Sequence, residues 1–222
     1  MSAALLDARA VIFDVDGTLV DTVDAHAESW RRAFSVFGRE FGFDEIRRQI
    51  GKGGDQLLPV FLSERDVEQE GDRIEAFRAD LFKREFLPNV RGFPKVRELF
   101  DRLIGDGKTI ALGSSAKGEE LDAYKSAAGI EDLRLVEVSS DDAERSKPHP
   151  DIFQAALDRL SLPAAEVIVV GDTPYDAEAA GKAGIRMVAV RCGGFDDTSL
   201  SEAGAIEIYD DPEHILASLP SR

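Results

Sequence analysis

The sequence has almost none of the features that crosslink a chain or anchor it in a membrane. Among its 222 residues there is one cysteine, Cys192, so no disulfide can form within the chain. No run approaches the roughly 20 apolar residues of a membrane-spanning helix. The first residues lack a basic segment followed by an uninterrupted apolar stretch, so we expect no secretory signal. Together these absences predict a cytoplasmic protein, because disulfides are rare in reducing compartments.

Positive charge is also scarce. Lys and Arg total 27 against 43 Asp and Glu, which gives a formal net charge of −16. This balance argues against nucleic acid and against an anionic membrane as partners, because both attract basic surfaces. With 43% hydrophobic residues the chain can still bury a full core, and its length suits one large domain or one domain with an insertion.

Short apolar runs recur along the chain and predict buried strands. They are rich in Val or Ile and cover 10–13, 109–113, 134–138, 167–171 and 187–191. Runs of this length suit parallel strands that are covered on both faces. Helical periodicity lies between them, over 94–107, 118–130, 150–162 and 175–185. The alternation predicts an α/β fold whose core is a Rossmann-like, doubly wound parallel sheet.

One block breaks this alternation. From about 22 to 87 the patterns are helical, most strongly over 27–38 and 72–86, with no convincing strand. We therefore expect an inserted α-helical domain at 21–88, while 1–20 and 89–222 form the α/β core. Pro88 and Pro94 mark the return to the core.

Polar side chains with useful chemistry cluster after the predicted strands and before one helix. They are Asp14, Asp16, Ser114, Ser115, Lys147, Asp172 and Asp176. Open α/β sheets bind ligands where the carboxyl ends of their strands meet. Several carboxylates gathered there repel one another unless a cation joins them, and oxygen ligands without nearby His or Cys indicate Mg²⁺. Mg²⁺ suits a phosphate substrate, whose remaining oxygens a lysine and a serine hydroxyl can hold.

These groups can support phosphoryl transfer. A carboxylate can attack phosphorus as a nucleophile and form an aspartyl phosphate. A second carboxylic acid nearby can protonate the leaving alkoxide and then deprotonate the water that releases phosphate. The residue types alone do not say which aspartate takes which role.

Four segments resemble the motifs of the haloacid dehalogenase superfamily, in its phosphatase branch. They are FDVDGTLVDT, ALGSS, SKPHPD and VGDTPYD, which occur in the family's order, and the resemblance spans nearly the whole chain. The family's helical cap lies between its first and second motifs, which is where this chain has its helical block. The resemblance therefore implies a Rossmann-like core with a cap over the carboxyl end of the sheet.

The same resemblance implies roles in catalysis and phosphate binding. Asp14 corresponds to the nucleophile and Asp16 to the general acid/base. Lys147 corresponds to the lysine that neutralises charge near the nucleophile and the phosphate. Ser114 corresponds to a phosphate ligand, with Ser115 as the competitor for that role.

A metal site is also implied. Asp172 would bind Mg²⁺ together with Asp14 and the backbone carbonyl of Asp16, and Asp176 would support the metal or its waters. The implied partner is a small phosphorylated metabolite, and the chain is expected to be a monomer or a homodimer.

Substrate choice in this family depends largely on the cap. His26, Lys52, Gly53 and Gly54 are the candidate substrate contacts there. The glycines of GKGGD suggest a loop whose backbone turns sharply or approaches a ligand. His26 and Lys52 have plainer interpretations as a packed histidine and a solvated lysine.

Asp16 separates the phosphatases from two other branches of the family. True haloacid dehalogenases lack this second aspartate and need no metal. Phosphonatases have a small residue at the Asp16 position and use a cap lysine as a Schiff base. Lys52 lies in the cap loop, but Asp16 disagrees with that chemistry.

The β-phosphoglucomutases are a nearer alternative. They share His26 and Trp30 at the same spacing, and a lysine like Lys117. They typically have an arginine where this chain has Gly54, and often a glutamate where it has Gly171. These two departures favour hydrolysis.

We therefore expect a Mg²⁺-dependent phosphatase, similar to phosphoglycolate phosphatases, that hydrolyses a small phosphomonoester through an aspartyl-phosphate intermediate. A sugar-phosphate mutase is the first alternative. A non-catalytic phosphate-binding module is the second, and the intact pair of Asp14 and Asp16 argues against it, because binding alone does not need an acid/base.

Overall fold

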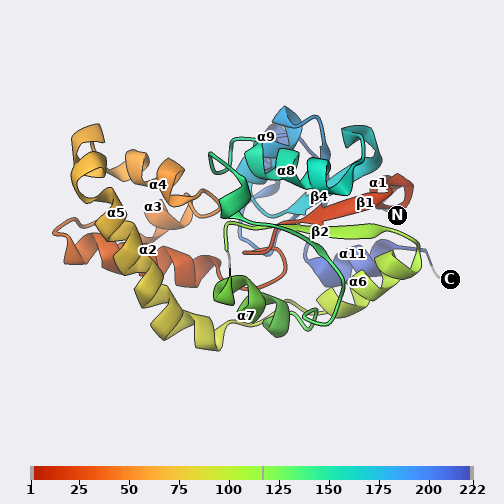
Figure 1. Cartoon of the computed structure of the whole chain (residues 1–222), viewed down its shortest axis with the longest axis horizontal. Coiled ribbons are helices and arrows are strands. Elements are labelled where there is room, and N and C mark those ends of the chain that lie inside the picture. Colours follow the sequence, from red (N-terminus) through yellow and green to blue (C-terminus); the bar gives the residue numbers. More distant parts are fainter. Residues whose placement is uncertain (1–2, 117, 221–222) are drawn as a thin grey trace.

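A parallel sheet with a separate helical lobe beside it makes up the protein (Figure 1). The computed structural model describes residues 3–116 and 118–220. The sheet has six strands in the order β3-β2-β1-β4-β5-β6, and every neighbouring pair is parallel. The strands are β1 (Ala10–Phe13), β2 (Thr109–Gly113), β3 (Val136–Val138), β4 (Val167–Gly171), β5 (Arg186–Val190) and β6 (Ala205–Tyr209). This topology confirms the predicted doubly wound, Rossmann-like sheet.

Two layers of helices enclose the sheet. The layer against one face comprises α1 (Ala3–Asp7), α6 (Val96–Gly105), α7 (Glu119–Ala127) and α11 (Pro212–Ser218). The opposite layer comprises α8 (Asp151–Leu160), α9 (Pro174–Lys182) and α10 (Asp197–Glu202). Alternate residues of β1 serve the two layers, since Val11 and Phe13 pack with the first and Ala10 and Ile12 with the second. Both faces are therefore buried, as the continuous apolar runs predict.

The helical lobe follows β1 directly. It comprises α2 (Val23–Val36), α3 (Phe43–Arg47), α4 (Gly54–Phe61), α5 (Glu64–Leu81), a π-helical turn (Phe82–Phe86) and a 3₁₀ turn (Leu87–Asn89). No strand occurs in this part of the chain. The lobe has its own apolar core, whose centre includes Trp30, Phe34, Leu57 and Ile74. Short 3₁₀ turns elsewhere cover Ser140–Asp142 and Ala164–Glu166.

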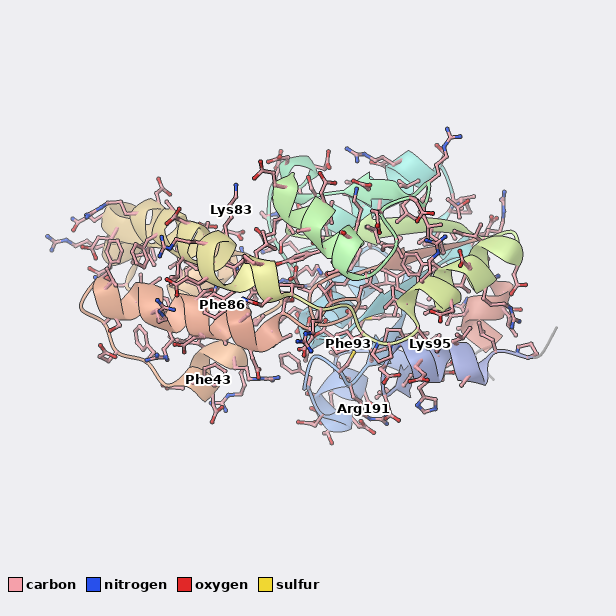
Figure 2. All side chains as sticks on the ribbon, turned by 90° about the horizontal axis from the view of Figure 1, so that it is seen from below. Phe43, Lys83, Phe86, Phe93, Lys95 and Arg191 are labelled. Carbon is pink, nitrogen blue, oxygen red and sulfur yellow. The ribbon has the colours of Figure 1, made fainter. Side chains whose placement is uncertain are left out.

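The lobe stands at the carboxyl ends of the strands, and we call it the cap (Figure 1). Its two connections to the sheet are adjacent and bonded to each other: the amide of Asp21 donates to the carbonyl of Arg91 (2.9 Å), and the amide of Phe93 donates to that of Leu19 (2.9 Å). Phe93 lies near this junction when the molecule is seen from below (Figure 2). Among the described helices, none combines the length and apolar character needed to cross a bilayer.

The structure differs from the sequence prediction mainly at the edges. The predicted strands agree with the observed ones to within two residues, but β6 was not predicted. Its residues are mostly half-exposed at the edge of the sheet, so they form no continuous apolar run. Likewise α5 begins at Glu64, ahead of the strong helical pattern at 72–86. The sequence does not predict this earlier start, because the first turns of the helix are charged and their helical pattern is weak.

The Phe100 side chain should be a major contributor to core stability. It is fully buried, and its ring centroid lies 4.7 Å from that of Phe13. Phe100→Ala should lower the free energy of unfolding by about 3–5 kcal/mol, through lost burial and a cavity. Urea unfolding measures this. Ile104→Ala on the same helix is the matched control; its side chain is 39% exposed, and a loss above about 0.5 kcal/mol there would contradict the account.

Candidate active site

Strand β1 brings the first two candidate residues to the carboxyl edge of the sheet. The amide of Asp14 donates to the carbonyl of Val170 (2.8 Å), so the ladder with β4 continues one residue beyond the strand. Gly17 then adopts a positive φ of 75°, and its amide bonds the carbonyl of Val20 (2.9 Å). This turn ends the strand at the centre of the sheet, where the strand order reverses and open α/β sheets form their binding crevice.

Asp14 is paired with Lys147 in a buried ion network. The Lys147 Nζ lies 2.5 Å from Asp14 Oδ1 and 2.6 Å from Asp176 Oδ1. Burial raises the pKa of Asp14 to about 7, although the Lys147 ammonium opposes the shift. Burial alone would lower the pKa of Lys147, but the two carboxylates outweigh it and raise that pKa. Lys147 therefore stays charged beside a carboxylate whose charge is costly to bury.

Two further carboxylates come from the end of β4 and the start of α9. Asp172 Oδ1 accepts a hydrogen bond from the Thr18 hydroxyl (2.9 Å), while its Oδ2 is buried without a hydrogen-bond partner among the described residues. Thr173 caps α9, and Asp176 Oδ2 accepts from the Thr173 amide (3.0 Å) and hydroxyl (2.6 Å). Burial, followed by the charges of Asp14 and Asp176, raises the pKa of Asp172 well above its usual value.

These carboxylates fit a hard divalent cation. Asp14, Asp172 and Asp176 each place an oxygen within 4.8 Å of the others, and all three are buried. The unpartnered Oδ2 of Asp172 and the mutual repulsion of the group are what a Mg²⁺ ion would relieve. The side chain of Asp16 is not part of this cluster, so any contribution from Asp16 would be through its backbone carbonyl.

Asp16 instead faces the cap. Its Oδ1 accepts from the Thr22 hydroxyl (2.7 Å) and lies 2.8 Å from Nε2 of His26. The other ring nitrogen of His26 lies 2.7 Å from Nη2 of Arg78, which can only donate, so Nδ1 accepts and Nε2 carries the hydrogen that Asp16 receives. Burial opposes ionisation of Asp16, but His26, Thr22 and Arg78 together hold its pKa below the usual value.

The His26 ring is fixed from several sides. It stacks on Phe82 with a centroid distance of 4.1 Å and an interplanar angle of 8°. The Tyr124 hydroxyl lies 3.2 Å from Nε2, and Arg78 lies over the ring of Trp30 at 5.3 Å. His26 is thus both packed and in contact with a candidate catalytic group. Sequence reasoning missed Arg78 and Tyr124, because each lies on a helix face whose periodicity predicts only packing.

The two candidate serines are placed differently. Ser114 is fully buried, and its hydroxyl oxygen accepts from the amide of Ala116 (3.0 Å). Ser115 is exposed and lines the space beside the carboxylates. Of the two, Ser115 is therefore the one that lines this space. Lys117, which resembles the mutase lysine, lies outside the described residues.

Two connected cavities extend from the carboxylates toward the cap. The inner chamber, about 30 Å³, is lined by residues that include Asp14, Asp16, Lys52, Arg78 and Lys147. The outer cavity, about 210 Å³, shares His26, Trp30, Lys52, Arg78 and Ser115 with it and adds Gly53, Gly54, Asp55, Glu75 and Glu120. The four predicted cap residues therefore meet Asp14, Asp16, Ser115 and Lys147 of the core around one space, whereas Ser114, Asp172 and Asp176 are not part of its lining.

The glycines of the cap loop are explained by contacts with the core. A Cβ on Gly51, whose φ is 107°, would lie 2.6 Å from the Thr173 side chain, and one on Gly53 would overlap the side chain of Ser146. The neighbouring Asp55 accepts a hydrogen bond from the Ser146 amide (3.1 Å). The loop thus docks on the segments that carry Lys147 and Asp176, and its glycines permit this close approach.

The fold and this site define a class: hydrolases with a carboxylate-based centre on an α/β core and a helical cap. A family model described as "Haloacid dehalogenase-like hydrolase" matches residues 11–190. The chain belongs to the haloacid dehalogenase-like hydrolase family.

Relatives agree with this assignment. The chain is 31% identical over 212 residues to "Phosphorylated carbohydrates phosphatase" of Thermotoga maritima, covering 94% of this chain and 96% of the relative. It is 29% identical to "Phosphoglycolate phosphatase" of Rhodobacter capsulatus, covering 82% and 83% of the two chains. A solved hydrolase from Pseudomonas syringae superposes with a TM-score of 0.87 at 27% identity, covering 94% and 96%. These matches confirm the family recognised from the four motifs and the expectation of a phosphatase-type enzyme.

Mg²⁺ should stabilise the folded protein through the carboxylate cluster. A cation at 100 times its dissociation constant adds about 2.7 kcal/mol to the free energy of unfolding. Asp172→Asn should abolish this gain. Without Mg²⁺ the same variant should be more stable than the wild type at neutral pH, because a carboxyl whose pKa is raised by folding destabilises the fold once the pH passes its unfolded pKa of about 3.9. Urea unfolding with and without Mg²⁺ measures both effects, and an equal Mg²⁺ gain in the variant would refute them.

Cap docking should depend on the gap at Gly53. Gly53→Ala places a methyl group against Ser146, so kcat/KM for p-nitrophenyl phosphate should fall about tenfold, equivalent to about 1.4 kcal/mol. Adding Ser146→Gly removes the opposing side chain and should restore most of the rate. Ser146→Gly alone is the control. A double variant no better than Gly53→Ala would show that this contact does not limit docking.

Proposed function

We propose that the protein is a Mg²⁺-dependent phosphatase that hydrolyses a small phosphomonoester by way of a phosphoryl group carried on Asp14. The observation that carries the proposal is the separation of two aspartates only two residues apart. Asp14 lies in the carboxylate cluster against Lys147, whereas Asp16 faces the cap and is held by His26 and Thr22. One is placed as a nucleophile at the metal cluster and the other as an acid/base beside the leaving group.

In the first step a carboxylate oxygen of Asp14 attacks phosphorus, and the bond between phosphorus and the ester oxygen breaks. Lys147 favours the ionised form of the nucleophile, against the effect of burial, and offsets charge on the phosphate. Asp16 gives its proton to the departing alkoxide. Although Asp16 has a lowered pKa in the free enzyme, a phosphate dianion beside it favours its protonated form.

In the second step Asp16, now a carboxylate, takes a proton from a water that attacks the phosphoryl group. The bond between phosphorus and the Asp14 oxygen breaks, which releases inorganic phosphate and regenerates the free carboxylate. Asp14, Asp172 and Asp176 would hold a Mg²⁺ ion, which would supply positive charge to offset that of the phosphoryl group. His26 holds Asp16 in place through both proton transfers, and the docked cap excludes bulk water.

The outer cavity supports a phosphorylated carbohydrate as the substrate class. Its lining residues include three acidic ones, Asp55, Glu75 and Glu120, against two basic ones, Lys52 and Arg78. The carboxylates can accept hydrogen bonds from hydroxyl groups, and their excess disfavours an anionic leaving group. The name of the Thermotoga maritima relative agrees with this. A phosphoglycolate-type substrate, as the Rhodobacter capsulatus relative is named for, carries a carboxylate and fits this wall less well.

A mutase reaction is less well supported. A Cβ on Gly54 would lie 2.5 Å from the carboxyl group of Glu75, so an acidic side chain occupies the space beside the position where mutases place an arginine. A Cβ on Gly171, where mutases often have glutamate, would lie 2.8 Å from the carboxyl carbon of Asp176. Incubation with a hexose phosphate separates the two functions, since a phosphatase releases inorganic phosphate and a mutase yields the isomer.

Asp14→Asn should remove the nucleophile and leave the fold intact. Phosphate release from p-nitrophenyl phosphate with Mg²⁺ should fall on the order of 10³-fold or more, as it does when nucleophiles are deleted from other hydrolases. EDTA should have a comparable effect on the wild type. Asp21→Asn, an exposed aspartate near the same motif, is the matched control and should keep its activity. Wild-type turnover in Asp14→Asn would disprove the mechanism, and no phosphate release by the wild type from any phosphomonoester would leave the non-catalytic module as the better account.

A further inference from the structure

Lys52 carries a charge in the cap loop that no described carboxylate contacts directly, although the charge of Glu178 on α9 acts on it from farther away. Its Nζ donates to Oε1 of Gln49 (2.6 Å) and lies 4.6 Å from the centroid of the Tyr175 ring. No ion pair joins it to any residue of the described ranges 3–116 and 118–220. Burial lowers its pKa, which shows that the ammonium is partly desolvated. A partly desolvated cation without a counter-ion is a ready site for an anion.

The position of Lys52 makes phosphate the fitting anion. Lys52 lines both the inner chamber, with Asp14 and Lys147, and the outer cavity. A phosphate group bound at Asp14 would lie in the inner chamber, whose lining includes both lysines. Lys52 can therefore bind phosphate oxygens from the cap side while Lys147 acts from the core side.

Tyr175 belongs to the core, yet its hydroxyl contacts the cap loop. It lies in the first turn of α9, next to Asp176. Its hydroxyl donates to the carbonyl of Arg48 (2.7 Å) and lies 3.4 Å from Oε1 of Gln49, the same oxygen that accepts from Lys52. The Tyr175 ring packs edge-on against Phe195, with centroids 6.1 Å apart, and this contact within the core helps to fix its orientation.

These contacts hold Lys52 only when the cap loop is docked. A lysine side chain is flexible, and the face of an aromatic ring attracts its ammonium. The ring is on the core, whereas Lys52, Gln49 and the Arg48 carbonyl are on the cap. Withdrawal of the loop would therefore separate the Tyr175 ring from Lys52, and the Tyr175 hydroxyl from Gln49 and the Arg48 carbonyl.

We propose that Tyr175 is a positioning residue that holds Lys52 against the substrate phosphate when the cap loop docks on α9. The proposal rests on the proposed phosphatase function for its substrate. On this account the contact between Tyr175 and Lys52, which lies outside the carboxylate cluster, makes the docked protein bind phosphate more tightly.

A double-mutant cycle tests the proposal with inorganic phosphate as the probe. Its dissociation constant is measured by calorimetry, with Mg²⁺, for the wild type, Tyr175→Leu, Lys52→Met and the double variant. Each single variant should weaken binding about fivefold, in the range of desolvated cation–π contacts. If Tyr175 acts through Lys52, the double variant should bind no more weakly than Lys52→Met alone.

Two outcomes would overturn it. One is Lys52→Met binding phosphate as tightly as the wild type. The other is a double variant whose loss is the product of the two single losses, which would mean that Tyr175 acts by another route. Should Tyr175→Leu fail to fold, Gln49→Leu replaces it in the cycle, because it removes the other support of Lys52.

Further variants separate the ring from the hydroxyl and from general effects. Tyr175→Phe keeps the ring and should lose less affinity than Tyr175→Leu. Tyr209→Phe removes a hydroxyl that bonds Glu207 on β6, and phosphate binding should not change. Because binding is read without turnover, failure of this proposal is distinct from failure of the phosphatase function, which shows as absence of phosphate release from p-nitrophenyl phosphate.

Discussion

The mutual repulsion of buried carboxylates at the carboxyl edge of the sheet is the constraint on which the rest of the structure depends. Asp14 and Asp172 follow two strands, and Asp176 lies in the first turn of a helix. Because β1 and β4 are parallel neighbours, the sheet brings these three carboxylates close together. Lys147 offsets part of their charge, and the remainder is suited to a metal ion and a phosphate. The cluster is costly in the free protein, and that cost is what gives a bound cation its affinity.

Much of the α/β core could be predicted because its signals are local. A strand such as 167–171 is a continuous apolar run, and Asp172 follows it directly. The edge strand β6 and the charged start of α5 lack such runs, since their stability comes from neighbours distant in the sequence. The candidate site divides in the same way. The aspartates and Lys147 could be named from the motifs, whereas the roles of Arg78 and Tyr175 are identified only by what the fold places beside them.

The two aspartates of the first motif illustrate how backbone geometry separates chemical roles. Asp14 continues the ladder and faces the carboxylate cluster, and Asp16 lies beyond it at the cap. Their environments move their pKa values in opposite directions, upward for Asp14 and downward for Asp16. The two aspartates are only two positions apart in the chain, yet the pKa of Asp14 depends on groups of the α/β core and that of Asp16 mainly on groups of the cap.

The paired connections between cap and core have a consequence for how such proteins can diversify. Both connecting segments leave the sheet at one place. Backbone hydrogen bonds from Asp21 to Arg91 and from Phe93 to Leu19 join them to each other. None of the ladders between neighbouring strands runs through the insert. Any helical segment whose ends lie equally close can therefore replace it without disturbing the sheet. The sheet and the helical lobe can therefore change independently of each other in sequence.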